Sequence, residues 1–171
     1  MRAVVCLTSS LLLLIAAPAR AADPVADAEL LSSFKVICVD AFGDATKVAA
    51  AATGAGLMKE VAGPGPDMGT AWHSSKLSIG YSDAAWLPKD LPSPQCSLKA
   101  VGLAAHDHAA LAARLGALLG LPAGKTKGKA GRFETQWDFA GTGKDRRRLF
   151  LTTAPSPEGP AIRISLLNLR R

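Results

Sequence analysis

Apolar side chains recur every three to four residues in three stretches of the chain, which is the spacing of an amphipathic helix. The stretches run over 25–38, 44–58 and 106–119. Asp23-Pro24 and Asp44 are residue types that begin helices, and Gly120 with Pro122 ends the third stretch. The sequence therefore predicts three helices.

Five other stretches alternate apolar and polar side chains, the period of a half-buried strand. They run over 76–81, 96–103, 132–139, 147–153 and 161–169. The clearest is 132–139, in which Phe133, Thr135, Trp137 and Phe139 share one face. Glycine- and proline-rich segments at 62–71, 88–94, 141–145 and 155–160 predict loops between them.

The order of these elements is helix, helix, strand, strand, helix, strand, strand, strand. Hairpin-length loops join the last three strands, so we expect them to pair antiparallel. Strands with one apolar face need cover on that face only. The sequence predicts an α+β fold, a two-layer sandwich with an antiparallel sheet of about five strands covered on one face by helices. Cys38 precedes one predicted helix and Cys96 another, which hints at two similar halves.

The first residues have the order of a secretory signal peptide. A short positive start, Met1-Arg2, precedes an apolar run that contains 11–15, and Pro18-Ala19-Arg20-Ala21 offers small residues where a signal peptidase reads. We expect cleavage after Ala21, a single globular domain over 22–171, and a periplasmic or secreted location. The alternative is an uncleaved N-terminal anchor.

Removal of the signal leaves two cysteines, Cys38 and Cys96. An even count in an exported chain predicts a disulfide, and two cysteines allow one intramolecular pairing. The alternative is a pair of buried free thiols. A metal site built on these two is not expected, because closely spaced partner ligands are missing.

Charge is distributed unevenly along the chain. Residues 22–112 carry six lysines against ten acidic residues, whereas 113–171 carry twelve lysines and arginines against four acidic residues. The C-terminal part is therefore basic, and a basic face attracts anionic partners. The alternative is a solvated face that keeps the protein in solution.

If the chain has a binding site, its basic residues are the first candidates. The predicted anion- or partner-binding residues are Lys125, Lys127, Lys129, Lys144, Arg146, Arg147 and Arg148. Arginine holds phosphate or carboxylate groups through two parallel hydrogen bonds. The predicted partner is an anionic envelope component or a protein. Few aromatic residues lie among the basic ones, which argues against nucleic acid.

The segment 120–126, GLPAGKT, is close to a nucleotide-binding P-loop but one residue too short. It also follows a predicted helix, where a P-loop would follow a strand and begin a helix. We interpret 120–129 as a flexible basic loop and predict no ATP binding and no other cofactor.

Other motifs of catalytic or metal-binding type are incomplete. Ser32-Ser33-Phe34-Lys35 matches the Ser-x-x-Lys of penicillin-recognising enzymes, but the companion motifs each miss by a residue. His106-Asp107-His108 resembles a metal-binding fragment. It is explained more simply as a helix start with Asp107 near the positive end of the helix dipole. We predict no catalytic residues and no metal site, and interpret the tryptophans as core or core rim.

The export signal, the Phe34-x-x-x-Cys38 stretch, the Gly43-Asp44 helix start and Cys96 before a strand resemble small exported two-cysteine proteins of Gram-negative bacteria with no assigned activity. That resemblance covers most of the mature chain and implies no catalytic residue. Two functions compete. The first is a non-catalytic binding module whose basic half meets an anionic or protein partner. The second is a small hydrolase or enzyme inhibitor that uses His73, His106 or His108.

Overall fold

The computed structural model describes residues 27–60, 69–83, 94–101, 106–143 and 145–169. Within them the chain forms one antiparallel sheet of eight strands in the order β1-β2-β3-β4-β8-β7-β6-β5. The strands are β1 (Met58–Lys59), β2 (Thr70–His73), β3 (Leu77–Ser82), β4 (Gln95–Ala100), β5 (Lys125–Lys129), β6 (Arg132–Ala140), β7 (Arg146–Ala154) and β8 (Ala161–Leu169). The predicted mixed α+β class is confirmed, whereas the predicted number of about five strands is too low.

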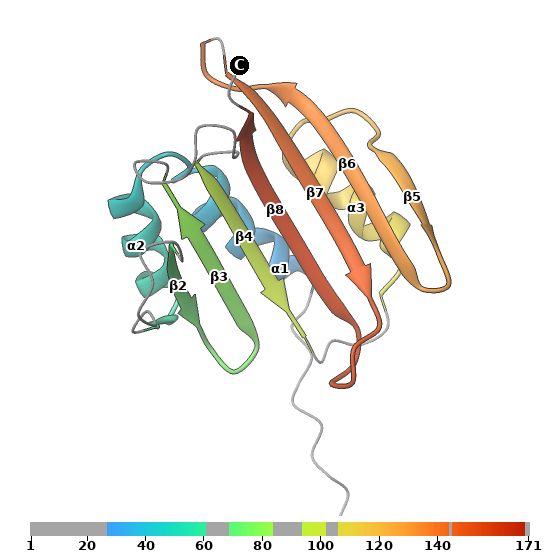
Figure 1. The fold of residues 1–171 in the computed structure, drawn as a ribbon, viewed down its shortest axis with the longest axis horizontal. Helices are drawn as coiled ribbons and strands as arrows, with labels where there is room; N and C mark the ends of the chain where they lie inside the picture. Colours follow the sequence, from blue (N-terminus) through green and yellow to red (C-terminus); the bar gives the residue numbers. More distant parts are fainter. Residues whose placement is uncertain (1–26, 61–68, 84–93, 102–105, 144, 170–171) are drawn as a thin grey trace, which may run out of the picture.

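Four helical segments accompany the sheet. They are α1 (Asp27–Phe34), a π-helical turn η1 (Lys35–Val39) that continues α1, α2 (Ala45–Gly54) and α3 (His108–Leu118). Figure 1 shows α1 and α3 behind the same face of the sheet, while α2 lies beside the edge that carries β2. The three predicted helices are therefore present, the first with its last turn widened to a π-helix.

Two aspartates begin helices as their sequence context suggests. The Asp44 carboxylate accepts hydrogen bonds from the backbone N–H groups of Thr46 and Lys47, both at 3.1 Å. The Asp107 carboxylate accepts from Ala109 at 2.9 Å and Ala110 at 3.3 Å. Each carboxylate satisfies backbone donors that have no partner inside the helix. Asp107 is thus engaged as a helix cap.

Alternate side chains of the strands point toward the helices and form one core. Its fully buried members include Phe34 from α1 and Ile37 from η1, Leu98 and Ile164 from the centre of the sheet, and Leu151 from β7. The tryptophans Trp72 and Trp137 are also buried there, as predicted; Trp86 lies outside the described residues. We call the opposite side of the sheet the polar face.

The disulfide between Cys38 and Cys96 is present, with the two Cα atoms 5.4 Å apart. It joins η1 to β4, and both residues are fully buried. The signal peptide and the cleavage site after Ala21 fall on residues outside the described part of the chain, so they stay predictions.

Each half of the chain has helical structure followed by four consecutive antiparallel strands, with α1, η1 and α2 in the first half and α3 alone in the second. The halves join where β4 pairs antiparallel with β8. As a result the last strand of each half lies at the centre of the sheet, while the first strand of each half, β1 or β5, lies at an edge. This arrangement places β8 beside β4 rather than at the end of the sheet.

Three strands were missed by the sequence prediction for different reasons. β1 has only two residues, and β2 was assigned in part to the glycine- and proline-rich loop. β5, with the sequence KTKGK, has no apolar face and all five of its residues are exposed. Its interpretation as a flexible loop is wrong, because it pairs over its whole length with β6.

Candidate functional site

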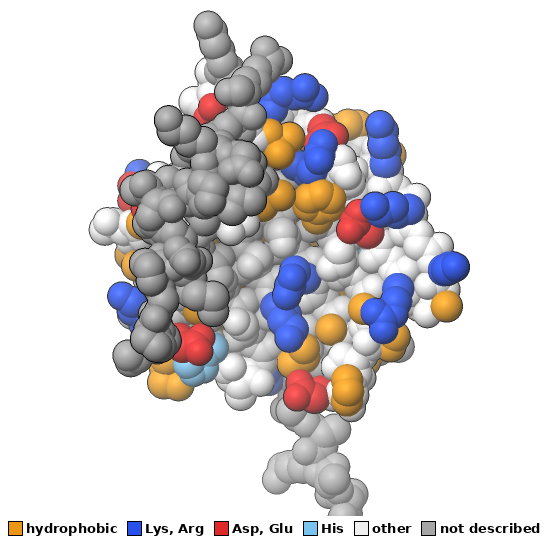
Figure 2. All heavy atoms as spheres, viewed as in Figure 1, with side chains coloured by type: hydrophobic (Ala, Val, Ile, Leu, Met, Phe, Trp, Pro, Cys, Tyr) orange, Lys and Arg blue, Asp and Glu red, His pale blue; other side chains and the backbone are white. Residues whose placement is uncertain are grey.

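Strand register brings basic residues from five strands to the polar face. Residues paired across a sheet point to the same side, and the side chain direction alternates along each strand. Lys127, Glu134, Thr152, Arg163 and Lys99 form one row across β5, β6, β7, β8 and β4. Extended to the other rows, the register places eight basic side chains on this face: Lys99, Lys125, Lys127, Lys129, Arg132, Arg146, Arg148 and Arg163. Figure 2 shows lysine and arginine side chains spread over it.

Acidic residues balance only part of this charge. Among the described strand residues, Glu134 and Asp138 point to the polar face, so eight positive charges meet two negative ones. Lys127 Nζ lies 2.9 Å from Glu134 Oε1. Arg148 Nε donates to Asp138 Oδ1 at 2.6 Å and lowers the pKa of that carboxyl. The other six cations have no ion pair within the described part of the chain, which leaves the face strongly positive.

The structure brings together five of the seven predicted binding residues. Lys125, Lys127 and Lys129 lie on β5, and Arg146 and Arg148 lie on β7. The lysines come from an ordered edge strand, so their side chains have a fixed spacing.

Arg147 is a correction to the predicted set. It points to the helix side of the sheet, where its guanidinium carbon lies 4.9 Å from the centre of the Phe42 ring. Its Nη2 also donates to Thr142 Oγ1 at 3.4 Å. Arg147 therefore packs against Phe42, between η1 and α2, and is not part of the basic surface. Lys144 lies outside the described residues.

Sequence reasoning missed three members of the basic surface, Lys99, Arg132 and Arg163. Alternation within each strand already places Arg132 and Arg163 opposite the apolar residues, which is a usable signal. The sequence does not reveal that β8 lies between β7 and β4. Without that pairing, nothing links Lys99 of the first half to the basic residues of the second half.

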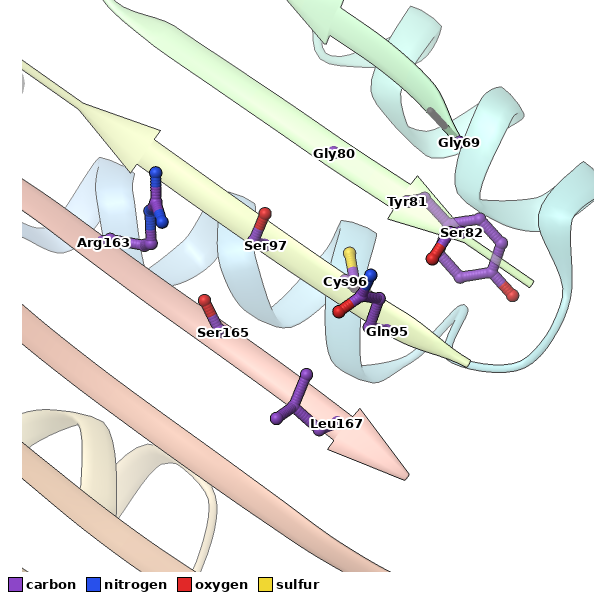
Figure 3. Close-up of a pocket in the computed structure, with 10 residues that line it drawn as sticks. All are labelled: Gly69, Gly80, Tyr81, Ser82, Gln95, Cys96, Ser97, Arg163, Ser165 and Leu167. Carbon is purple, nitrogen blue, oxygen red and sulfur yellow. The ribbon is translucent and has the colours of Figure 1, made fainter. Parts of the chain in front are cut away.

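A pocket of about 350 Å³ lies over β3, β4 and β8 (Figure 3). Its floor includes Gly80, Ser97 and Ser165, which lie in one register row and continue from Phe150 of β7. The side chain shrinks along this row from a phenyl ring to two hydroxymethyl groups and a hydrogen atom. Small side chains on three neighbouring strands therefore create this pocket, which we call the hollow.

The hollow is lined by neutral polar groups with one cation at its rim. Figure 3 shows the Ser97 and Ser165 hydroxyls with Gln95 along the floor, and the Arg163 side chain extending from β8 toward β4. Ser82 is 93% buried, and its hydroxyl has no hydrogen-bond partner within the described residues. Such a buried polar group without a partner typically costs about 1–3 kcal/mol.

The histidines divide between two places. His106 and His108 line one pocket of about 390 Å³ at the start of α3, whereas His73 lies on β2, in the other half of the sheet. His106 Nδ1 lies 2.6 Å from Asp27 Oδ1. Two of the three candidate bases are thus brought together.

His108 is held by threonine hydroxyls. Its Nδ1 lies 3.0 Å from Thr153 Oγ1, and its Nε2 lies 2.8 Å from Thr135 Oγ1. Thr135 Oγ1 in turn lies 2.7 Å from Thr126 Oγ1. Burial lowers the pKa of His108, which favours the neutral ring. With both nitrogens engaged, His108 serves to tie α3 to the sheet. Within the described ranges, no three histidine, cysteine, aspartate or glutamate side chains gather as a metal-binding group.

Comparison of the sequence with models of protein families, with curated proteins and with solved structures finds no match. None of the helices in the described part of the chain is long and apolar enough to cross a membrane.

Proposed function

We propose that the protein is a non-catalytic binding module that holds an acidic polysaccharide on the polar face of its sheet. In this proposal the helices and the sheet form two layers, which leaves the polar face for the ligand. The carrying observation is the convergence of eight basic side chains from five strands on one face, against two acidic ones. A surface of one charge sign attracts an oppositely charged polymer and speeds its association.

The regular spacing of the charges suits an extended chain. Lys125, Lys127 and Lys129 alternate along β5, so the Cα atoms of neighbouring lysines are about 6.6 Å apart along the strand. Strands lie about 4.8 Å apart in the other direction. A polymer that carries an acidic group on each unit can therefore contact several cations at once, and weak single contacts add up.

Two observations favour a polysaccharide over nucleic acid. Among the described strand residues, Phe150 is the one Phe, Tyr or Trp side chain on the polar face, and the Arg148 guanidinium carbon lies 6.0 Å from its ring centre. Binders of single-stranded nucleic acid usually stack bases on several aromatic side chains. The serine hydroxyls of the hollow match the hydroxyl groups of sugars.

The proposed place of action is the periplasm or the outside of the cell. The Cys38–Cys96 disulfide supports it, because disulfides persist in oxidising compartments.

The test is titration of the mature chain with polygalacturonate at several salt concentrations. Affinity should fall as salt rises. The triple variant Lys125→Gln/Lys127→Gln/Lys129→Gln should lose roughly tenfold in affinity, from about 0.5 kcal/mol for each exposed charge. The matched control, Lys35→Gln/Lys47→Gln/Lys59→Gln, removes the same charge from η1, α2 and β1. Equal losses in the two variants would contradict a defined surface, and tighter binding of single-stranded DNA would contradict the choice of polymer.

A second candidate function, a hydrolase or inhibitor that uses a histidine, is favoured by the contact between Asp27 and His106. The Asp27 carboxylate lies within ion-pair distance of His106 Nδ1, although no hydrogen bond joins the two. His106 Nε2 is buried without a hydrogen-bond partner within the described residues, and an imidazole nitrogen of this kind can act as a base. The variant His106→Asn distinguishes the two functions. It should leave polygalacturonate binding unchanged, whereas a hydrolase would lose its turnover of ester or amide substrates.

A further inference from the structure

We propose that the hollow is a subsite for one anionic sugar unit, a sugar ring that carries a carboxylate or a phosphate. This inference rests on the proposed function and names the unit that the polar face selects from a polysaccharide. Three features carry it: the cation Arg163 at one end of the hollow with Lys99 directly opposite it, the unpartnered Ser82 hydroxyl at the other end, and a shape set by small side chains.

The charged end is formed by Arg163 of β8, which lines the hollow, and Lys99 of β4 lies directly opposite it, beyond the lining residues. Both are exposed basic residues, and their Cβ atoms lie about 4.5–5.5 Å apart in such a pair. Like charges directly opposite destabilise a sheet. The acidic residues of the same face are engaged elsewhere, Glu134 with Lys127 and Asp138 with Arg148.

An anion between the two cations would relieve this repulsion. A guanidinium group holds a carboxylate or a phosphate through two parallel hydrogen bonds, and a neighbouring ammonium adds a point charge. The charged end of the hollow therefore calls for an anionic group on the ligand.

The other end calls for a hydroxyl-bearing ligand. Ser78 of β3, Lys99 and Arg163 lie in one register row. Ser82 lies four residues further along β3 than Ser78. At about 3.3 Å per residue, the two ends are roughly 13 Å apart. A free phosphate ion cannot reach from the Arg163 guanidinium to the Ser82 hydroxyl. A sugar unit with its anionic group covers part of this distance, and the long Arg163 and Gln95 side chains can reach toward it from the two ends, so that its hydroxyls lie near Gln95 and Ser82.

The size of the hollow limits what it holds. About 350 Å³ is at the small end of the range for ligand pockets, roughly 300–1,000 Å³. Gly80 keeps this space open, since a Cβ atom there would lie 3.3 Å from Ser97 Oγ. Leu167 borders the hollow and offers an apolar contact for the C–H groups of a sugar ring.

The experiment is calorimetric titration of the mature chain with single units. The probes are galacturonic acid, glucose 6-phosphate, galactose and inorganic phosphate. We expect one or both of the acidic sugars to bind, and galactose and inorganic phosphate to bind at least tenfold more weakly. The difference between galacturonic acid and glucose 6-phosphate tells which anionic group is preferred. Equal binding of inorganic phosphate and the acidic sugars would overturn the sugar subsite.

Variants locate the binding in the hollow. Arg163→Gln should weaken the acidic sugar at least tenfold, whereas Lys47→Gln, with the same charge change on α2 and away from the basic surface, should leave it within about twofold. Gly80→Val fills the hollow and should abolish binding. If this variant does not fold, Ser97→Ala/Ser165→Ala removes both floor hydroxyls without adding volume. Equal effects of Arg163→Gln and Lys47→Gln, or unchanged binding in the variant that alters the floor, would overturn the inference.

The outcome separates this inference from the proposed function. If polygalacturonate binds through β5 while no acidic sugar unit binds, the subsite is wrong and the binding surface stands. If polygalacturonate fails to bind, the proposed function is wrong, and the subsite falls with it.

Discussion

Reduction of the disulfide between Cys38 and Cys96 should destabilise the protein by about 4 kcal/mol. The two residues are 58 positions apart. Closing a loop of that length lowers the conformational entropy of the unfolded chain and so raises its free energy by roughly this amount. Domains are usually stable by about 5–15 kcal/mol, so the bridge contributes a large share. For a domain of this size, the loss corresponds to a fall in Tm of about 8–16 °C.

The assay is urea unfolding of the oxidised and the reduced protein, followed by circular dichroism. Reduction leaves the side chains in place, so it tests the cross-link without creating a cavity. The dependence of the unfolding free energy on urea should also become steeper, because the reduced unfolded chain is more expanded. The control Cys38→Ala/Cys96→Ala should not respond to reductant. A change below about 1 kcal/mol on reduction would refute the reasoning that the bridge acts through the unfolded state.

Three further outcomes are expected. Burial lowers the pKa of His108 in the folded state, so its contribution to stability should be complete above about pH 6.5 and should fall as the solution is acidified. The free energy of unfolding should fall by at most about 1.4 kcal/mol per pH unit. Urea unfolding midpoints measured across pH should show this fall, and His108→Gln should reduce it. Asp44→Ala removes a helix cap and should cost about 1 kcal/mol by urea unfolding, whereas Asp40→Ala, which breaks an exposed ion pair, should cost at most about 0.5 kcal/mol. Gly124→Ala would place a Cβ atom 2.5 Å from the buried indole of Trp137 and should destabilise the protein by about 1–3 kcal/mol in thermal melts. Gly54→Ala lies in α2, where the new Cβ atom would meet no other atom within 4 Å, and it should stabilise the protein by about 0.5–1 kcal/mol.

Local signals predicted most of the elements. The helix starts at Asp44 and Asp107 need only a short side chain near free backbone donors, so a few residues decide them. The strand over 132–139 was found because its apolar side chains alternate and it is buried on one face. β5 could not be found in this way, since it is an edge strand with no buried residue and is held by backbone pairing and polar side-chain contacts with β6.

The candidate site was only partly predictable, for a topological reason. The cluster of Lys125, Lys127, Lys129 and the arginines at 146–148 stands out in the sequence, but its surface depends on which side each residue points to. Arg147 differs from its neighbours by one position and therefore lies on the other side of the sheet. The hollow depends on β4 and β8 being neighbours, although they are more than sixty residues apart in sequence. No local pattern contains that pairing.

The position of β5 at the end of the strand order has a consequence for the behaviour of the protein in solution. An edge strand offers free backbone groups to other molecules, and lysines on it are a common defence against edge-to-edge aggregation. β5 carries three lysines and no apolar side chain. The residues proposed to attract the ligand are therefore also those that keep separate molecules apart. Changes to this strand must be judged by monodispersity as well as by affinity, because one short segment governs both.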